Sequence, residues 1–514
     1  MALPFNTTAP GRGRTQESTA VVPDYVFILV FSESEPDREG ECGPLHGSEP
    51  WLLGRGGPGN YVVFFRQLPG VEPPPRRGEA CLGGETLSRL QAEVEVRPDG
   101  VHIWNLGGIP MYVDGVETSY AVALLGAKVH FENEVVLLVT LRPRVMPALR
   151  EATVNHEFGT ADGLGFVGES PGMWNARDAG ALAAVMDDNV LLLAESGTGK
   201  ELLAHAIHNG SKRAGKTMVV VNSTVVTESL SQQNLFGNLR GFPNSDTPQR
   251  EGYFSQAHGS TLFLDEIGDC PKDLQKQLLR TLQSGEIQVL GEPLPRNVDV
   301  RTIGATDQGT ENFEEAFDGR FPRRIFLPPL RERREDIVLI VRRIVVRYAS
   351  RRPQLARLLR KWPSGDLYPR ISPRLVNYLL GLYLTKNVRD LEALVTLAID
   401  ESAGDKVEMF SERVLSAIVE PKWGPESPSV RRALARLTPT VPLSGQQPSK
   451  PPSSPLSASS EKGAASSRRE DPTREEMLAT VEREWWNVRA SAKALGISEP
   501  RMYRLMERYG IKRP

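Results

Sequence analysis

The sequence has few of the residues that tie a chain to covalent cross-links or to a membrane. Only three of its 514 residues are cysteine, and Cys42, Cys81 and Cys270 are far apart and match no metal-binding or redox spacing. We expect three small buried hydrophobic side chains in a reducing compartment. No run approaches the roughly 20 apolar residues of a membrane span, and the opening MALPFNTTAPGRGR lacks the apolar core of a signal peptide. The sequence therefore predicts a cytoplasmic protein with no membrane partner.

The chain also lacks an excess of either charge. Its 62 Lys and Arg residues nearly balance 64 Asp and Glu residues, which leaves a net charge of −2. Any contact with nucleic acid must therefore come from a local basic surface, because the whole molecule does not attract phosphate. The chain is too long for a single hydrophobic core, so the usual domain size predicts about three domains.

The pattern of apolar residues divides the chain into five segments. Residues 24–142 alternate short β-branched and aromatic runs, such as AEVEV and VHIW, with turn signals, which is typical of an all-β sandwich. Residues 164–335 place the apolar runs VLLLA, MVVVN, TLFLDE and VRTIGAT between helical stretches, which predicts an α/β domain with a parallel sheet. After LPPLRERREDI we expect no further strands, and residues 336–420 predict a helical lid. Residues 421–472, dense in Pro, Ser and Gly, predict a disordered linker, and helical periodicity returns over 473–514.

The run VLLLAESGTGKE predicts a phosphate-binding loop between a buried strand and a helix. Backbone N–H groups at such a helix start can hold phosphates, and the ammonium of Lys200 can reach the β and γ oxygens. Ala194 and Glu201 replace the first glycine and the final hydroxyl residue of GxxxxGK[ST], so a structural turn stays open as the alternative. The residues that we assign to ATP binding in this run are Glu195, Ser196, Gly197, Thr198, Gly199, Lys200 and Glu201.

A second element further along the chain strengthens that assignment. TLFLDEIGD places Asp265 and Glu266 at the end of an apolar strand. One carboxylate there can hold Mg²⁺, directly or through water, and its neighbour can polarise a water molecule. Adjacent acids at a strand end also occur in solvated loops. Together with the upstream loop, in this chain order, they predict an ATP site in which Asp265 faces Mg²⁺.

These motifs carry a family resemblance. VGESPGM, the phosphate loop, LFG, AHGSTLFLDEIGD, LPPLRERREDI and NVRDLE make residues from about 165 to 419 similar to the AAA+ domain of bacterial enhancer-binding proteins, the activators of sigma-54 RNA polymerase. In that family the loop normally reads GESGTGKE. Glu201 is therefore usual for the family, and only Ala194 departs.

The resemblance implies roles for three further residues. Asn222 would couple the ATP site to remodelling, and Arg389 would sense nucleotide from the lid. Arg320 would project toward the γ-phosphate in a neighbouring subunit, which requires a homo-oligomer, from a dimer to a hexameric ring. A surface ion pair is the structural alternative for either arginine.

Two departures from the family pattern bear on activity. The loop that contacts polymerase reads GAFTGA in the family and GFPNSD here, at residues 241–246, so its Thr and Phe are absent. Pro243 stiffens the loop and Asp246 adds charge, which argues against engagement of sigma-54. Glu314 stands in place of the first of two finger arginines and Asp307 in place of the sensor Asn. A carboxylate near a γ-phosphate repels it, which predicts slow hydrolysis.

The N-terminal segment resembles a forkhead-associated (FHA) domain, a β-sandwich that reads phosphothreonine. The matching stretches are LLGRGG, LSRLQAEVEVRPDGVHIWNLGG and MYVDG. The resemblance implies that Arg55 and Ser88 donate hydrogen bonds to phosphate, with Arg89 beside them. The family's loop Asn falls at about Pro110, and its usual His is Gln91. A protein-docking sandwich that reads no phosphate is the alternative.

The C-terminal segment predicts a helix-turn-helix. One helix ends at Leu495, Ser498 caps the next and Pro500 lies in its first turn, a spacing that resembles the Fis-type element of enhancer-binding proteins. From residue 485 to 514, seven Lys or Arg face two Glu, a surplus of five positive charges that favours DNA as the partner. The side chains assigned to DNA are Arg501, Tyr503, Arg504 and Arg508. A hairpin used only for dimerisation is the alternative.

The sequence as a whole thus predicts a multidomain protein: an all-β FHA-like sandwich, a central α/β AAA+ domain with a helical lid, and an all-α helix-turn-helix. We expect a DNA-binding transcription regulator of the sigma-54-dependent family, with ATP and Mg²⁺ as cofactors. Sigma-54 RNA polymerase and a phosphothreonine protein are candidate partners. Two other interpretations stay open: an active sigma-54 ATPase whose altered loop still couples, and a non-hydrolysing, nucleotide-sensing regulator or repressor. ATP turnover that depends on oligomerisation would separate them.

Overall fold

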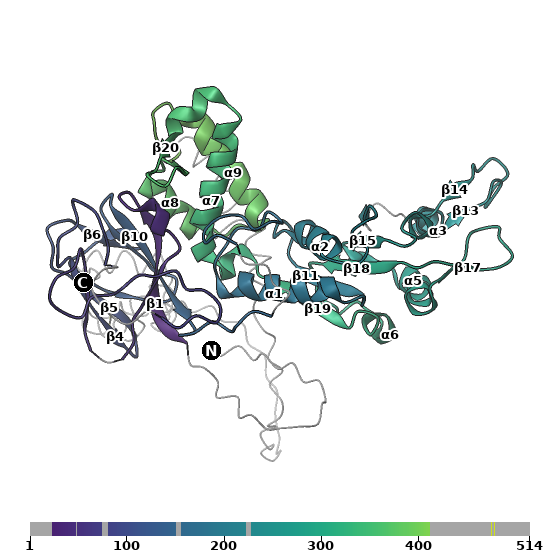
Figure 1. Ribbon diagram of the computed structural model, residues 1–514, viewed down its shortest axis with the longest axis horizontal. Helices are drawn as coiled ribbons and strands as arrows, with labels where there is room; N and C mark the ends of the chain where they lie inside the picture. The colour runs from purple at the N-terminus through teal and green to yellow at the C-terminus, as the bar shows by residue number, and fades with distance from the viewer. Residues whose placement is uncertain are drawn as a thin grey trace, which may run out of the picture. The chain divides into compact units, whose positions relative to one another are not determined.

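The central part of the chain folds around a parallel sheet, shown in Figure 1. The computed structural model describes residues 23–47, 49–73, 81–150, 156–222 and 228–411, together with Arg474 and Met477. The chain divides into two compact units, Met1–Pro439 and Thr440–Pro514, and nearly all described residues belong to the first. The parallel strands are β11 (Val190–Ala194), β12 (Val219–Asn222), β15 (Thr261–Asp265), β18 (Arg301–Thr306) and β19 (Arg323–Leu327). Their order is β12-β15-β18-β11-β19.

Successive side chains of β11 lie on opposite faces of the sheet and pack in two different hydrophobic cores. Val190 and Leu192 pack with residues of α1 (Pro171–Val185) and α2 (Lys200–Asn209) on one face of the sheet. Leu191 packs on the other face, with residues of α5 (Lys272–Ser284) and α6 (Glu315–Asp318). A strand covered on both faces reads as a continuous apolar run, which is why VLLLA predicts it correctly.

One strand of this sheet was not predicted. β19 lies at the sheet edge and pairs in parallel with β11. Arg323 and Arg324 interrupt its apolar pattern, and only Ile325 and Leu327 enter the core. An edge strand has one side free of pairing partners, so its sequence needs fewer apolar residues than a central strand does.

The N-terminal residues form two antiparallel sheets, in agreement with the predicted all-β sandwich. One sheet has the order β2-β1-β10-β9-β6-β7 and the other β3-β4-β5-β8. The first contains β1 (Asp24–Ser32), β2 (Cys42–Pro44), β6 (Met111–Val113), β7 (Val116–Glu117), β9 (Lys128–Phe131) and β10 (Val135–Arg142). The second contains β3 (Trp51–Leu53), β4 (Ala92–Arg97), β5 (Gly100–Asn105) and β8 (Tyr120–Ala123). A shared apolar core, which includes Phe27, Val94 and Phe131, lies between them.

The lid consists mainly of α7 (Ile337–Ser350), α8 (Pro373–Gly381) and α9 (Asn387–Glu401). The helical runs beginning at residues 336 and 372 therefore appear as predicted. The expectation of no further strands is wrong, because β20 (Leu359–Lys361) and β21 (Leu367–Pro369) form an antiparallel hairpin within the lid. Its turn contains Gly365 at a φ of +97°, a conformation that favours glycine.

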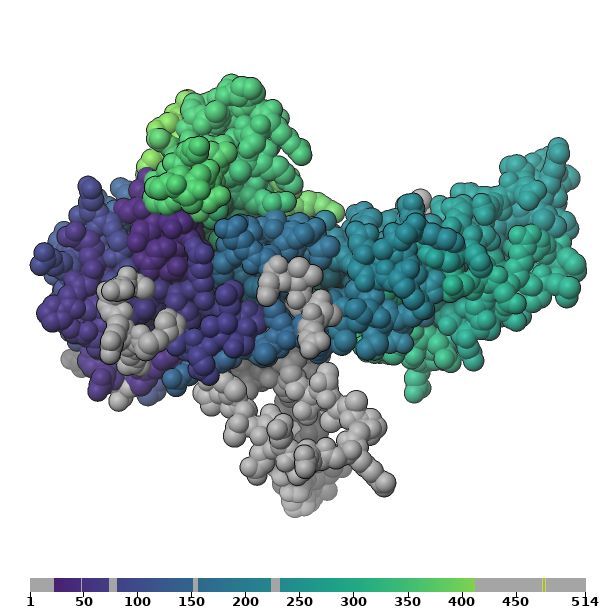
Figure 2. Space-filling model, in the orientation of Figure 1, coloured from purple at the N-terminus to yellow at the C-terminus, as the bar shows by residue number. Residues whose placement is uncertain are grey.

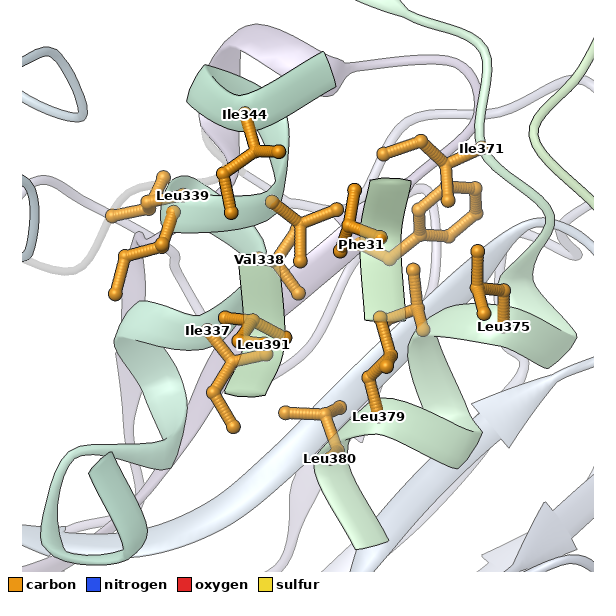
Figure 3. Packing of buried hydrophobic residues seen from close by; sticks show 14 of the residues in the cluster. Phe31, Ile337, Val338, Leu339, Ile344, Ile371, Leu375, Leu379, Leu380 and Leu391 are labelled. Carbon is orange, nitrogen blue, oxygen red and sulfur yellow. The ribbon is translucent and has the colours of Figure 1, made fainter. Parts of the chain in front are cut away.

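The lid and the six-stranded sheet share one hydrophobic core (Figure 3). Phe31 of β1 lies among Val338 of α7, Leu375 of α8 and Ile371. Figure 2 shows the lid, in green, against the purple N-terminal strands. Alternate residues of β1 thus serve two cores: Phe27 and Leu29 face the sandwich interior, whereas Val26, Ile28 and Val30 face the lid. This double burial explains why YVFILVF lacks the polar alternation of a half-exposed strand.

Two expectations about composition can be compared with the described residues. Cys42, Cys81 and Cys270 are all buried free thiols, as predicted. Within the described residues no helix is both long and apolar enough to span a bilayer. The predicted linker, 421–472, and nearly all of the predicted helix-turn-helix, 473–514, lie outside the described residues.

Candidate nucleotide-binding site

A cavity of about 510 Å³ opens at the carboxyl ends of the parallel strands, where ligands bind in open α/β sheets. It lies between the phosphate loop, which follows β11, and the lid helices α7 and α9. Most residues that the sequence assigns to ATP binding or catalysis line this cavity. They are Ser196, Gly197, Thr198, Gly199, Lys200, Glu201, Asn222, Asp265, Glu266 and Arg389.

Two positions of the loop require glycine. A Cβ atom on Gly197 would lie 2.0 Å from the Lys386 carbonyl oxygen, and the φ of Gly197 is +76°. Gly199 is the N-cap residue of α2, at a φ of +113°, where a Cβ would lie 2.8 Å from the ring of Phe166. Ala194, by contrast, lies within β11, so the missing first glycine imposes no strain. The loop therefore keeps the backbone that phosphate binding needs.

A lysine and a carboxylate face each other in the cavity. Lys200 is buried at the start of α2, and its Nζ lies 3.1 Å from Oδ1 of Asp265. Asp265 ends β15 and pairs in register with Asn222, which ends the neighbouring strand β12. Glu266 follows in the left-handed region at a φ of +58°. The sheet thus brings together residues that are distant in sequence, as expected for adjacent parallel strands.

The lid contributes lining residues that the sequence reasoning missed. Ile340, Arg343, Ile344 and Arg347 of α7 line the cavity at helical spacing. Arg347 forms an ion pair with Glu392. The run DIVLIVRRIVVRYASR predicted the helix, but its amphipathic pattern does not tell which residues face a ligand and which face the core.

Arg333 is the most buried cation in the lining, with 2% of the residue exposed. Its guanidinium donates to the carbonyl oxygen of Thr198 (3.2 Å) and to Sδ of Met173 (2.7 Å). Burial lowers the pKa of Arg333. This side chain places a positive charge directly behind the phosphate loop.

Two predicted site residues are not among the described lining. Arg320 follows α6, and its carbonyl oxygen accepts a hydrogen bond from Asn189. Glu195 belongs to the phosphate loop, but both of its carboxylate oxygens accept hydrogen bonds from Arg331 (2.6 and 2.7 Å). Neither Asp307, after β18, nor Glu314, before α6, is in that lining either.

Residues 241–246, where GFPNSD stands in place of GAFTGA, lie in the hairpin that connects β13 (Gly237–Asn238) to β14 (Arg250–Glu251). A second hairpin, β16 (Glu286–Ile287) and β17 (Arg296–Asn297), lies beside it, and Leu239 donates its N–H to the Leu290 carbonyl oxygen (2.9 Å). Figure 1 shows both hairpins at the same end of the α/β domain. Phe242 packs over Gly291 yet stays 46% exposed, and Leu294 is 73% exposed. An exposed aromatic residue is therefore present, one position before the Phe of the family pattern.

In the sandwich, the predicted phosphate-contacting residues come from two adjacent loops. The N–H of Arg55 donates to the carbonyl oxygen of Ser88 (3.1 Å), and the Ser88 hydroxyl accepts from the N–H of Gly108 (3.1 Å). Arg55 and Arg89 are exposed. Gln91, which stands in place of the family's His, is buried and donates to Oδ1 of Asn105 (2.7 Å).

The residues assigned to DNA contact, Arg501, Tyr503, Arg504 and Arg508, lie outside the described residues.

Comparison with known proteins identifies the central domain. Residues 166–327, which include all five parallel strands, match the sigma-54 interaction domain. The transcriptional regulatory protein ZraR of Klebsiella oxytoca is 38% identical over 49% of this chain and 55% of its own length. The nitric oxide reductase transcription regulator NorR1 of Cupriavidus necator is 42% identical over 36% of this chain and 38% of its own length.

Among solved structures, NtrX from Brucella abortus, crystallised in complex with ATP, is 22% identical, with a TM-score of 0.41 over 67% of this chain and 69% of that chain. The chain spans about half the length, or less, of the two curated relatives. The domain match and these relatives agree with the resemblance that the motifs carry. The central part of the chain, residues 166–327, thus matches the sigma-54 interaction domain and is similar to transcription regulators such as ZraR and NorR1.

Proposed function

We propose that this chain binds ATP with Mg²⁺ in the cavity at the strand ends and acts as a DNA-binding regulator of transcription. The pairing of Lys200 with Asp265 at 3.1 Å, beside a loop with the required glycines, carries the proposal. The ammonium would hold the β and γ phosphates, and the carboxylate would hold Mg²⁺, whose charge offsets that of the phosphates. Glu266 would orient the attacking water.

The fit of Mg²⁺ rests on the chemistry of the donors. Asp265 and Glu266 are adjacent carboxylates, the oxygen ligands that Mg²⁺ prefers, and the remaining ligands come from phosphates and water. The Lys200 ammonium, 3.1 Å from Asp265, offsets the charge of this carboxylate. Mg²⁺ bound with ATP would offset that charge instead, while Lys200 holds the phosphates.

The test is steady-state ATP turnover across protein concentrations, for the wild type, Lys200→Ala and Glu266→Ala. We expect turnover that rises with concentration, because Arg320 would act on a neighbouring subunit's nucleotide. Lys200→Ala should weaken ATP binding about 10- to 100-fold, the range for hydrogen bonds between charged groups. Glu266→Ala should retain binding and lose turnover.

The outcomes distinguish ATP hydrolysis from nucleotide binding alone. Nucleotide binding without turnover at any concentration would favour the nucleotide-sensing regulator or repressor. Absence of Mg²⁺-ATP binding by the wild type would refute the proposal.

We further propose that the paired hairpins form the surface that contacts sigma-54 RNA polymerase. Two exposed apolar side chains, Phe242 and Leu294, lie on adjacent loops, and aromatic residues such as Phe are enriched at protein interfaces. The DNA contact is proposed from the basic C-terminal segment alone, since its residues lie outside the described part of the chain.

We also propose that the N-terminal sandwich reads phosphothreonine. Arg55, whose N–H donates to the Ser88 carbonyl oxygen, and Arg89, the next residue after Ser88, are both exposed. The Ser88 hydroxyl accepts a hydrogen bond from the N–H of Gly108 and can donate its own proton. We expect a phosphothreonine peptide selected from a library to bind at least about 10-fold more tightly than its unphosphorylated form, and Arg55→Ala to abolish the difference. Fluorescence anisotropy measures both affinities. Lys212→Ala, a surface cation outside the sandwich, is the control. Equal binding of the two peptides would leave a docking sandwich as the function.

A further inference from the structure

The first turn of α9 donates hydrogen bonds to three sites on the phosphate loop. The N–H of Val388 donates to the carbonyl oxygen of Gly197 (3.1 Å), and the Arg389 guanidinium donates to Oγ of Ser196 (3.2 Å). The side-chain amide of Asn387 donates to the carbonyl oxygen of Ser196 (3.0 Å). First-turn N–H groups have no partner within their own helix, so the loop supplies one here. The lid is thereby bonded directly to the loop that surrounds phosphate.

Glu195 and Arg331 form the charged part of this junction. The pair is bidentate, with N–O distances of 2.6 and 2.7 Å, and 18% of the Arg331 side chain is exposed. The Arg331 guanidinium also lies over the ring of Tyr383, 5.6 Å from its centroid. Burial alone would lower the pKa of Arg331, but the hydrogen bonds from its guanidinium to Glu195 raise it. The two charges are therefore held in one geometry.

Asn387 joins this pair to the lid backbone. It is fully buried, at a φ of +50°, and its Oδ1 accepts the N–H of Leu330 (2.7 Å). Its Nδ2 lies 3.3 Å from Oε2 of Glu195. A left-handed conformation is uncommon for a non-glycine residue, and asparagine is the type that best tolerates it. One side chain thus bonds both the segment that carries Arg331 and the loop that carries Glu195.

We propose that Glu195 and Arg331 are a positioning pair that holds the lid over the nucleotide, and that Glu195 itself does not bind ATP. This inference rests on the proposed ATP site. Arg343, Ile344 and Arg389 line the cavity from the lid, so they reach a nucleotide only while the lid is fixed relative to the loop. The pair fixes this geometry before ATP arrives, which lowers the conformational cost of binding.

The experiment compares Glu195→Gln, Arg331→Gln and the double variant in the full-length chain. The probe is a fluorescent ATP analogue with Mg²⁺, and ATP turnover gives KM and kcat separately. Each single variant should weaken analogue binding and raise KM roughly 10-fold, about the size of one charge-assisted hydrogen bond, while kcat changes less than about 2-fold. The double variant should match the single variants, because either one already breaks the pair. Arg331→Lys, which keeps the charge, should restore part of the affinity.

The controls distinguish the effect of breaking the Glu195–Arg331 pair from a general loss of positive charge or of folding. Arg352→Gln removes an arginine of the lid that is paired with Asp400 at 3.6 Å on the surface, and it should leave KM unchanged. Thermal unfolding midpoints check that each variant folds, and Arg331→Lys serves if Arg331→Gln does not.

Two results would overturn the pairing. If Arg331→Gln keeps full affinity while Glu195→Gln loses it, Glu195 contacts nucleotide directly. If the effects of the single variants multiply in the double variant, the two residues act separately. If the wild type binds no analogue, or Lys200→Ala leaves binding unchanged, the ATP-site proposal has failed instead.

Discussion

Replacing Arg142 with Met should lower the free energy of unfolding by about 3–5 kcal/mol, the cost of leaving one partner of a buried ion pair alone. Arg142 ends β10 with 1% of its side chain exposed, and its Nη2 lies 3.1 Å from Oε1 of Glu335. It also donates to Oε1 of Gln67 (3.3 Å). Without the guanidinium, the buried Glu335 carboxylate loses its ion-pair partner. Urea unfolding, followed by tryptophan fluorescence, measures the change.

The double variant Arg142→Met with Glu335→Leu distinguishes charge burial from loss of packing. Apolar replacement of both partners should recover most of the lost stability, because no unpaired charge remains. Arg150→Met removes a surface pair with Asp178 and should cost no more than about 1 kcal/mol. If Arg142→Met costs as little as this control, the sandwich is not held to the lid by the ion pair.

A second large effect should appear when pH is varied. Glu39 follows the turn Pro36–Arg38, and burial raises its pKa to about 8 despite the nearby Arg342 and Arg360 and a hydrogen bond from the Ser32 backbone. The folded state therefore holds a proton that the unfolded chain loses above its ordinary pKa of 4.5. The resulting stability is fully present below pH 4.5 and is lost as pH rises through 8. The loss attributable to Glu39 should be on the order of 4 kcal/mol.

Glu39→Gln isolates this contribution, because glutamine resembles the protonated acid and does not ionise. The stability of the wild type relative to the variant should fall from pH 5 to pH 8 and level off above it. Unfolding midpoints in urea at each pH measure the difference, with Glu49→Gln, an exposed position, as the matched control. A constant difference between wild type and Glu39→Gln across this range would show that Glu39 is ionised in the folded state.

Much of the candidate site was predictable because its signals are local. A strand, a glycine-containing turn and a helix start are adjacent in sequence, and Asp265 follows its strand directly. Parallel strands end at one edge of a sheet, so these segments lie along the same edge, and the strand order decides which of them are neighbours. The resemblance added Asn222 and Arg389, which line the same cavity. Arg333 lies within the motif LPPLRERREDI, but no local pattern indicated its place behind the loop, which depends on how the segment after β19 folds back.

The sequence by itself determined the parallel core strands, the all-β N-terminal segment and the phosphate loop, since apolar periodicity and glycine placement follow from short-range geometry. The sequence also indicates that both faces of β1 are buried, because this strand is apolar on both faces, whereas AEVEV in β4 alternates apolar and polar residues. Only the tertiary structure decided which surface covers the outer face of β1, and that surface is the lid. It also decided that Glu195 pairs with Arg331 rather than facing the cavity. Partners so distant in sequence are chosen by packing and countercharge, which no local pattern encodes.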